Sequence, residues 1–376
     1  MNFNIKDLIQ KIPTSVKLSI LIVILSKILV LSLGYTVTYF NSGTASPISI
    51  VMYMFNKWDT PHYVDIAKNW YVNTGDQANF IVFFPLYPIL IRLFTIDFSY
   101  ATLTALLISN ICSLIAFFYL YKLAKLDYND SAAIKAAIFL SIFPVAYFLS
   151  APYTEGLFFA LVITSTYYAR TNRWKIAGPI SFLAALTRIG GLILLPALLV
   201  EYFHQKGWKL RKIDARVLWI FLALAGFLLY LAINYQVTGN PTTFLTVEAQ
   251  HWNNRLDPWG GLTAAYNWAK DASYPDNVSI GIAPLAFAIF GLLMIGISIW
   301  KRLRLVYIVY MSLSWALAIS TSWWISVPRY IMAMFPMFFV FGLITKRKMV
   351  NVALALTSTV LLCYFTIFFA RGWWAF

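Results

Sequence analysis

Acidic residues are scarce in this chain of 376 residues, which has 14 aspartates and glutamates against 29 lysines and arginines. Charged residues of both signs make up only 11% of the sequence, whereas hydrophobic residues make up 61%. About a quarter of the residues in a soluble globular domain are charged. The shortage of charge therefore excludes an ordinary soluble domain. Apolar runs long enough to cross a bilayer recur from end to end, and they predict an all-α polytopic membrane protein.

Cysteine and histidine are rarer still, with two and three copies. Cys112 and Cys363 both lie in apolar runs, where cysteine is typically a small core residue. We therefore expect no disulfide and no metal site built on cysteine. One histidine and two aspartates near residue 60 are weak evidence for a metal site, so no metal and no other cofactor is predicted.

The net charge of +15 does not indicate a nucleic-acid partner. Most positive residues form short clusters between apolar runs, as the positive-inside rule predicts for cytoplasmic loops. We interpret these clusters as topology signals only. They are Lys122/Lys125/Lys135, Arg170/Arg173/Lys175, Lys206/Lys209/Arg211/Lys212/Arg216, Lys301/Arg302/Arg304 and Lys346/Arg347/Lys348.

The apolar runs and the positive clusters together predict about eleven transmembrane helices. Lys6, Lys11 and Lys17 precede the first run, so we expect the N-terminus in the cytoplasm. The run 176–203 is long for one crossing and is interrupted at Arg188, where we predict that two helices meet. This division places all five positive clusters on the same side as the N-terminus.

Residues 1–376 are predicted to form a single integral membrane domain. In this topology residues 41–99 form a large first outer loop, and residues 236–279 form a second one. We expect these two loops to form a site on the extracytoplasmic side. Within the first loop, the run 83–88 carries two prolines among aromatic residues, which argues against a plain spanning helix. A segment that lies in the interface or re-enters the membrane fits this run better.

Asp59, His62 and Asp65 fall within seven positions of the first outer loop. Pro61 disfavours helix at the residue before it and is tolerated in a first turn, so a helix is expected to start near it. His62 and Asp65 would then share one helix face, with Asp59 in the turn before them. A carboxylate held there could take a proton or accept hydrogen bonds from a sugar. The alternative for Asp59 is a helix cap.

Other unusual polar residues fall on the same outer side. They are Glu155, Arg188, Gln250, His251, Arg255 and Arg329. Ionisable groups in or near membrane helices are costly and are often functional. Because arginine suits bidentate phosphate binding, we hypothesise a site for a phosphate-bearing lipid, with Asp59 activating an acceptor hydroxyl. The alternatives are snorkelling for the arginines and solvated loop positions for Gln250 and Arg255.

Several of these stretches resemble the family of the GPI-anchor second mannosyltransferase and its prokaryotic relatives. The resemblance rests on motifs that occur in order through most of the chain. They are Trp58-Asp59 with His62-Tyr63, Phe84-Pro85-Leu86-Tyr87-Pro88, Pro152-Tyr153-Thr154-Glu155, Thr187-Arg188 with Gly190, Gln250 with Trp252 and Arg255, and Arg329-Tyr330 with Phe335-Pro336. The ordered set is more specific than any of its short motifs.

The resemblance implies a GT-C membrane glycosyltransferase that uses a polyprenyl-phosphate sugar, here mannose, on the extracytoplasmic side. It implies transfer with inversion to a hydroxyl of a lipid, glycan or protein acceptor. It also implies an acidic base in the first outer loop, a position that Asp59 matches. The implied substrate-binding residues are His62, Asp65, Glu155, Arg188, Gln250, Trp252, Arg255, Arg329 and Tyr330.

Two other functions stay open on the sequence alone. A transporter or flippase of lipid-linked sugars would place its polar residues near the bilayer midplane, often at paired broken helices. The break at Arg188 is the feature that favours this alternative. A non-catalytic subunit of a glycan assembly complex is the third possibility. In all three cases membrane lipids surround the protein.

Overall fold

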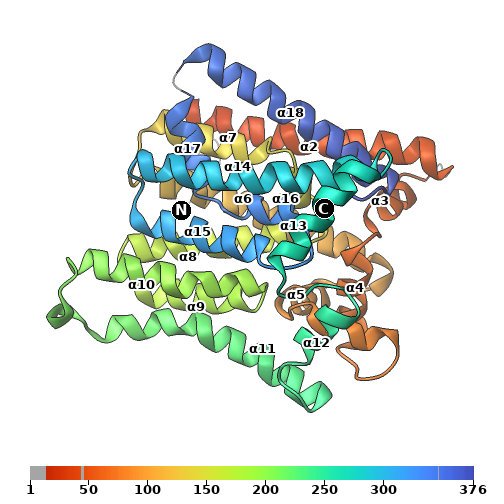
Figure 1. The fold of residues 1–376 in the computed structure, drawn as a ribbon, viewed down its shortest axis with the longest axis horizontal. Coiled ribbons are helices and arrows are strands. Elements are labelled where there is room, and N and C mark those ends of the chain that lie inside the picture. The colour runs from red at the N-terminus through yellow and green to blue at the C-terminus, as the bar shows by residue number, and fades with distance from the viewer. Residues whose placement is uncertain (1–13, 44–45, 346) are drawn as a thin grey trace, which may run out of the picture.

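The structure of the protein is a computed structural model that describes residues 14–43, 46–345 and 347–376. Helices account for nearly all of its regular structure (Figure 1). Pairing of extended segments in this described part is limited to an isolated bridge between Leu256 and Thr321. The prediction of an all-α protein is therefore confirmed.

The helices have the following bounds. The α-helices are α2 Thr14–Ser42, α3 Pro47–Phe55, α4 Asp59–Asn69, α5 Leu86–Phe94, α6 Ala101–Ala124, α7 Asp130–Ser141, α8 Glu155–Arg170, α9 Trp174–Ala185, α10 Leu194–Gln205, α11 Leu222–Thr238, α12 Thr243–Gln250, α13 Pro258–Asp271, α14 Ala283–Trp300, α15 Leu305–Ile319, α16 Val327–Met332, α17 Met337–Ile344 and α18 Lys348–Arg371. Shorter 3-10 segments are η1 Asp76–Val82, η2 Phe98–Tyr100, η3 Ala146–Leu149, η4 Ile189–Ile193, η5 Leu210–Lys212, η6 Ala215–Phe221 and η8 Trp324–Ser326, and η7 Asn277–Ile282 is a π-helix.

Five helical stretches of the described residues are long and apolar enough to cross a membrane. They are Ile20–Ser42, Phe98–Ala124, Ala215–Thr238, Asn277–Trp300 and Lys348–Arg371. Two bent pairs also pass the test, which gives up to seven spans. The chain is thus a multi-pass membrane protein. The predicted number of eleven is not confirmed, because other apolar helices, such as Ile189–Gln205 and Leu305–Ile319, are shorter.

The bent pairs show where prolines interrupt the apolar runs. Asp76–Val82 and Leu86–Phe94 meet at 112°, and the aromatic run around Pro85 lies at this bend. The prediction that this run is not a plain spanning helix is confirmed. Trp324–Met332 and Met337–Ile344 meet at 63°, within an apolar stretch of the sequence. Pro336 lies at this second bend. The helix is interrupted there because proline has no backbone N–H to continue it.

The predicted break at Arg188 is also present. Helix α9 ends at Ala185, and α10 begins at Leu194 after the short segment η4. Gly191 permits this sharp connection, since a Cβ atom there would lie 2.4 Å from the backbone of Ala184. The run 176–203 therefore forms two helices that meet at Arg188.

The two ends of the bundle are formed by different elements. Helices α3, α4, α5, α12 and α13 gather at the right in Figure 1, whereas the α10–α11 and α17–α18 connections lie at the left. The α10–α11 connection contains one positive cluster, and Arg347 and Lys348 of another lie at the start of α18, so the predicted outer loops lie at the opposite end from these residues. Lys6, Lys11 and Lys346, which contribute to the topology prediction, lie outside the described residues.

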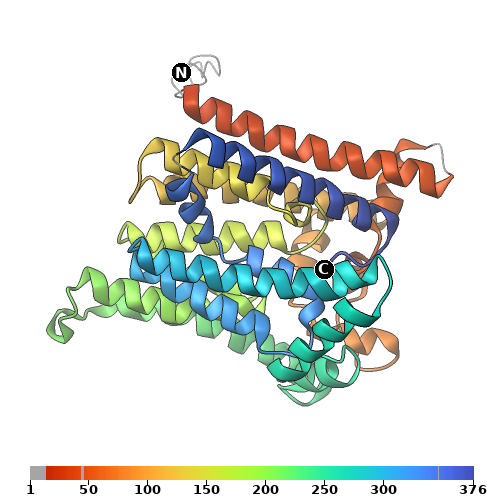
Figure 2. The same cartoon turned by 45° about the horizontal axis from the view of Figure 1, so that its top comes forward.

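Helices α16 and α17 run through the centre of the bundle, and α2 and α18 lie side by side along one face (Figure 2). Met332, Phe335 and Phe338 are fully buried. The rings of Phe139 on α7 and Phe341 on α17 stack with their centres 4.6 Å apart. This packing fixes α16, and with it Arg329, against the surrounding helices.

Candidate functional site

Helix α4 begins at Asp59, slightly earlier than the predicted start near Pro61. The residue before it, Trp58, has a φ of 54°, in the left-handed region that non-glycine residues rarely adopt. Residues held in such conformations often occur at functional sites. The turn places the Asp59 carboxylate in the wall of a cavity.

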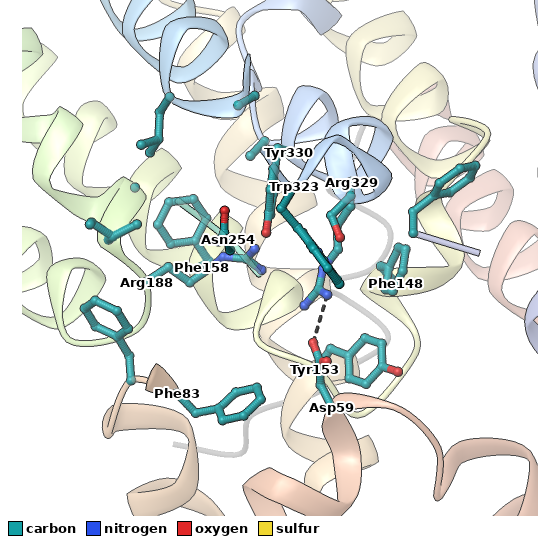
Figure 3. A pocket seen from close by; sticks show the side chains of 18 of the residues that line it. Asp59, Phe83, Phe148, Tyr153, Phe158, Arg188, Asn254, Trp323, Arg329 and Tyr330 are labelled. Atoms are coloured by element: carbon teal, nitrogen blue, oxygen red, sulfur yellow. Dashed lines mark hydrogen bonds and ion pairs between the residues drawn. The ribbon is translucent and has the colours of Figure 1, made fainter. Parts of the chain in front are cut away.

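Four charged side chains of alternating sign form a chain along this wall, which we call the ion chain: Asp59, Arg329, Glu155 and Arg188. Arg329 Nη1 donates a hydrogen bond to Asp59 Oδ2 at 2.8 Å, and Figure 3 shows the two side chains pointing toward one another. Arg329 Nε and Arg188 Nη1 both donate to Glu155 Oε1. Arg188 also donates to Thr154 Oγ1 at 3.1 Å. The charges of the ion chain sum to zero, so four ionised groups can share a largely buried site.

Aromatic rings hold both guanidinium groups in place. The Arg329 guanidinium lies 4.9 Å from the ring centre of Phe148 and 5.1 Å from that of Tyr153. The Arg188 guanidinium lies 5.6 Å from the ring centre of Tyr330. Such cation–π contacts add to the ion pairs and restrict how the arginines can turn.

Close helix packing explains why Glu155 is buried. Glu155 is the first residue of α8, and only 2% of its surface is exposed. At the next residue, Gly156, a Cβ atom would lie 2.3 Å from the backbone oxygen of Ser109 on α6. Ser109 Oγ also donates to the backbone oxygen of Tyr153 at 2.8 Å. The two helices therefore touch through their backbones and enclose the start of α8, as small residues permit in membrane bundles.

The cavity has a volume of about 300 Å³, which lies at the small end of the range for ligand pockets. Its lining is mostly aromatic and apolar, and Asp59, Arg188, Glu248 and Arg329 are its charged residues. Figure 3 shows three of them, Asp59, Arg188 and Arg329, among aromatic side chains. Contributing segments come from α4, the η1–α5 bend, η3, α8, η4, α12, the loop after it, α15, α16 and the C-terminal residues. A site of this kind suits a ligand that has both an anionic group and an apolar or sugar part.

Several of the sequence-predicted site residues meet in the cavity. Asp59, Arg188, Trp252, Arg329 and Tyr330 line it. Glu155 lies behind this lining, where it joins the two arginines. The structure thus brings together residues from five separate segments of the sequence.

His62 lies one layer outside the cavity. Its ring packs 4.4 Å from Phe80, 5.1 Å from Phe83 and 5.7 Å from Trp252. Burial lowers the pKa of His62, although the nearby Asp59 and Asp65 oppose this effect. The imidazole is therefore neutral at pH 7 and acts as an aromatic support for Phe83 and Trp252, both of which line the cavity.

Three predicted substrate-binding residues lie away from the cavity. Asp65 faces outward from α4, where its carboxylate accepts a hydrogen bond from Asn69 at 2.8 Å. Gln250 is exposed at the end of α12. Arg255 is exposed and lies 3.6 Å from Asp257. The helical turn of α4 and the course of the loop after α12 direct these side chains away from the ion chain.

Glu248 and Asn254 also line the cavity, although neither was predicted as a site residue. Asn254 Nδ2 donates to Glu248 Oε2 at 2.8 Å. Burial raises the pKa of the Glu248 carboxyl, and the negative charge of Asp59 raises it further. The sequence signal that could have identified Glu248 is that it is an acidic residue, in a chain with few of them, just before Gln250.

The described residues contain no group of three or more His, Cys, Asp or Glu side chains that could hold a metal ion. The cavity offers the charged groups of the ion chain and its neighbours. The arginines can bind an anion, and the carboxylates can accept a proton or hydrogen bonds.

A family model described as dolichyl-phosphate-mannose-protein mannosyltransferase matches residues 84–235. This range is less than half of the chain. It includes Glu155 and Arg188, whereas Asp59 and Arg329 lie outside it. The resemblance to the GPI-anchor second mannosyltransferase stays a prediction, since the matching model describes a different family. None of the curated proteins compared with the sequence matches it.

The fold is similar to that of the apo form of an oligosaccharyltransferase from Archaeoglobus fulgidus, with a TM-score of 0.50 and 12% sequence identity. The likeness covers 95% of this chain and 56% of that chain, so this chain spans just over half the length of the solved protein. The same oligosaccharyltransferase in complex with zinc and sulfate gives a TM-score of 0.46 and 13% identity, over 94% of this chain and 53% of that chain. At this identity the first likeness shows the fold alone, and the predicted GT-C-like fold is confirmed.

Proposed function

We propose that the protein is a membrane glycosyltransferase that transfers a hexose from a polyprenyl-phosphate donor to an acceptor hydroxyl. The proposed hexose is mannose. The acceptor is a lipid, a glycan or a protein. The observation that carries this proposal is the ion chain in the wall of an aromatic cavity, where two arginines lie beside a carboxylate. The family match and the GT-C-like fold support it.

The two arginines are the groups proposed to bind the donor phosphate. Within the ion chain Arg188 donates through Nη1, and Arg329 donates through Nε and Nη1. The Nη2 group of each has no hydrogen-bond partner among the described residues. These remaining N–H groups suit a phosphate oxygen, because arginine binds phosphate through charge-assisted hydrogen bonds.

Asp59 is proposed as the general base. Its Oδ2 is occupied by Arg329, whereas Oδ1 accepts no hydrogen bond within the described part of the chain. Oδ1 takes the proton of the acceptor hydroxyl as that oxygen attacks C1 of the sugar. The C1–O bond to the phosphate breaks, and its electron pair leaves with polyprenyl phosphate beside the arginines. Attack from the face opposite the leaving group gives inversion at C1.

The active site is proposed to face the extracytoplasmic side, with the N-terminus in the cytoplasm. This orientation rests on the positive clusters, which favour the cytoplasmic face. Helix α4, which begins with Asp59, lies at the opposite end of the bundle from the α10–α11 and α17–α18 connections (Figure 1).

The test is transfer of mannose from polyprenyl-phosphate mannose to a panel of lipid, glycan and peptide acceptors by purified protein. Asp59→Asn should reduce transfer by about 10²- to 10⁴-fold, the usual contribution of a positioned base. Binding of the donor and the thermal unfolding midpoint should remain close to those of the wild type. Asp271→Asn, at an exposed position on α13, is the matched control.

Equal transfer by the wild type and Asp59→Asn would reject Asp59 as base. Movement of the lipid-linked sugar across a vesicle membrane without transfer would instead support the transporter. Binding of the donor with neither transfer nor movement would support a non-catalytic subunit.

A further inference from the structure

Glu248 is a carboxylate in the cavity wall that does not belong to the ion chain. It lies on α12, whereas the members of the ion chain come from α4, α8, α16 and the turn before η4. No arginine, lysine or histidine pairs with it among the described residues. The charges of the ion chain already sum to zero, so Glu248 has no role in balancing them.

The neighbours of Glu248 hold it in one orientation. Asn254 Nδ2 donates to Glu248 Oε2 at 2.8 Å, and the backbone N–H of Asn254 donates to the backbone oxygen of Glu248 at 2.8 Å. The other carboxyl oxygen, Oε1, has no hydrogen-bond partner in the described residues. One acceptor is thus fixed by the protein and the other is left for a ligand.

The surroundings of Glu248 favour a particular kind of ligand. A carboxylate repels a phosphate, which is drawn to the arginines, but it accepts hydrogen bonds from hydroxyl groups. Trp252 lines the same cavity and packs against His62 and Phe83, at 5.7 and 5.8 Å between ring centres. A flat apolar ring beside a hydrogen-bond acceptor suits a sugar ring, which has C–H faces and hydroxyl edges.

We propose that Glu248 binds a hydroxyl group of a sugar ring in the cavity, and that Asn254 is the residue that positions it. This inference rests on the proposed function for the identity of the sugar-bearing substrate. The hydroxyl can belong to the sugar of the donor or to a sugar of the acceptor. The cavity then has two parts, with phosphate at the arginines and the sugar hydroxyl at Glu248.

The test measures binding of three probes to the detergent-purified full chain. They are polyprenyl-phosphate mannose, polyprenyl phosphate without a sugar, and a short alkyl mannoside without phosphate. The variants are Glu248→Gln, Glu248→Ala and Asn254→Ala, with Asp271→Asn as the control. An unfolding midpoint of Glu248→Gln at least as high as that of the wild type verifies that the fold is intact.

Glu248→Ala should weaken binding of a sugar-bearing probe by about tenfold or more, the size expected for a hydrogen bond to a charged group. Glu248→Gln and Asn254→Ala should cause smaller losses, and binding of polyprenyl phosphate should not change. A loss for polyprenyl-phosphate mannose assigns the hydroxyl to the donor. A loss for the alkyl mannoside alone assigns it to the acceptor.

The proposal is overturned if the Glu248 variants bind both sugar-bearing probes as tightly as the wild type does. It is also overturned if binding of polyprenyl phosphate falls by the same factor, or if the wild type binds neither sugar-bearing probe. A wild type that binds the alkyl mannoside but no polyprenyl phosphate would contradict the proposed function. The alkyl mannoside would still decide the role of Glu248.

Discussion

Two groups of charged residues, at opposite ends of α8, each contain two acids and two arginines. The ion chain includes Glu155, the first residue of this helix, and the second group includes Arg170, the last one. We call the second group the basal cluster: Asp127, Arg170, Glu201 and Arg304. Both groups are neutral and largely enclosed, so neither composition nor net charge separates them.

The basal cluster has its acceptors filled. Arg170 donates to both carboxyl oxygens of Asp127, at 2.5 and 2.7 Å, and Tyr307 adds a bond of 2.8 Å. Arg304 donates to both oxygens of Glu201, at 2.7 and 2.8 Å. Such bidentate pairs have fixed geometry, and no carboxyl oxygen is left for a ligand. The basal cluster therefore acts as a structural link between helices.

The ion chain has acceptors left over. Glu155 Oε1 accepts from both arginines while its buried Oε2 has no partner, and Asp59 uses one of its two oxygens. Buried polar groups are normally satisfied, so an unpartnered carboxyl oxygen requires an explanation. For Asp59, which lines the cavity, a site that is completed by its ligand provides one, whereas Glu155 lies behind the lining. Arg170 Nε in the basal cluster also lacks a hydrogen-bond partner, so unfilled acceptors on the carboxylates, rather than the presence of charge, distinguish the candidate site.

The largest expected effect comes from opening the basal cluster. Glu201 is fully buried, and Glu201→Ala leaves Arg304 and Arg170 without their shared carboxylate. We expect a loss of about 3 kcal/mol in the free energy of unfolding, because an unpaired charge remains in a poorly solvated place. Thermal or denaturant unfolding of the purified protein measures it. A variant with normal stability but no transfer would contradict the structural role.

The second-largest effect is expected for the transfer activity of a variant of the ion chain. Glu155→Gln removes the charge that joins Arg188 and Arg329, so both guanidinium groups lose their fixed positions. We expect kcat/KM for transfer to fall about 10- to 100-fold, as is typical when a supporting residue of a site is lost. The stability loss should be smaller than for Glu201→Ala, since glutamine keeps a side-chain oxygen that can accept hydrogen bonds from both arginines, whereas alanine removes the group. The reverse order of stability losses would refute the distinction between the two groups.

A smaller effect is expected for Arg188→Lys. Lysine keeps the positive charge but lacks the planar fork that binds Glu155 and a phosphate together. We expect the KM for the donor to rise several-fold, up to about tenfold, equivalent to about 1.4 kcal/mol, with kcat changed less. Initial rates over a range of polyprenyl-phosphate mannose concentrations separate the two constants. An unchanged donor KM with a lower kcat would assign Arg188 to the reaction step instead of phosphate binding.

The smallest effect is expected for the pH dependence of stability in a Glu248 variant. Burial raises the pKa of this carboxyl above its ordinary value of 4.5. A group with a raised pKa in the folded state contributes stability that is present below its unfolded pKa and is lost as pH rises through the folded pKa. From pH 4.5 upward, Glu248→Gln should therefore gain stability relative to the wild type. Unfolding midpoints of both proteins between pH 4 and 7 measure this difference, and a constant difference would argue against the raised pKa.

Much of the candidate site was predictable, because charge in an apolar chain is costly and therefore conspicuous. Asp59, Arg188 and Arg329 were identified in this way, and the break at Arg188 followed from the length of an apolar run. Asp65 was predicted to share a helix face with His62, next to Asp59, because residues three positions apart lie on the same side of a helix. Sequence spacing does not predict which face of α4 lines the cavity. In the structure Asp65 lies on the outer face of the helix.

The basal cluster was not predictable for a related reason. Arg170 and Arg304 belong to positive clusters that were interpreted as topology signals only, and that interpretation is incomplete for both. Their acidic partners, Asp127 and Glu201, are 43 and 103 positions away in the sequence. Pairing over such separations depends on how α8, α10 and α15 pack against each other.

The sequence by itself determined that this is a helical membrane protein and which of its few polar residues are costly to keep. Local physical chemistry suffices for both, because hydropathy and proline act within one segment. Only the tertiary structure decided that Asp59 meets Arg329, 270 positions away, and that Glu248 faces the same cavity. Helix α12 is too short for its hydrophobic pattern to define a buried face. Helix packing selects which of the available carboxylates lie beside the arginines, and this selection creates the site.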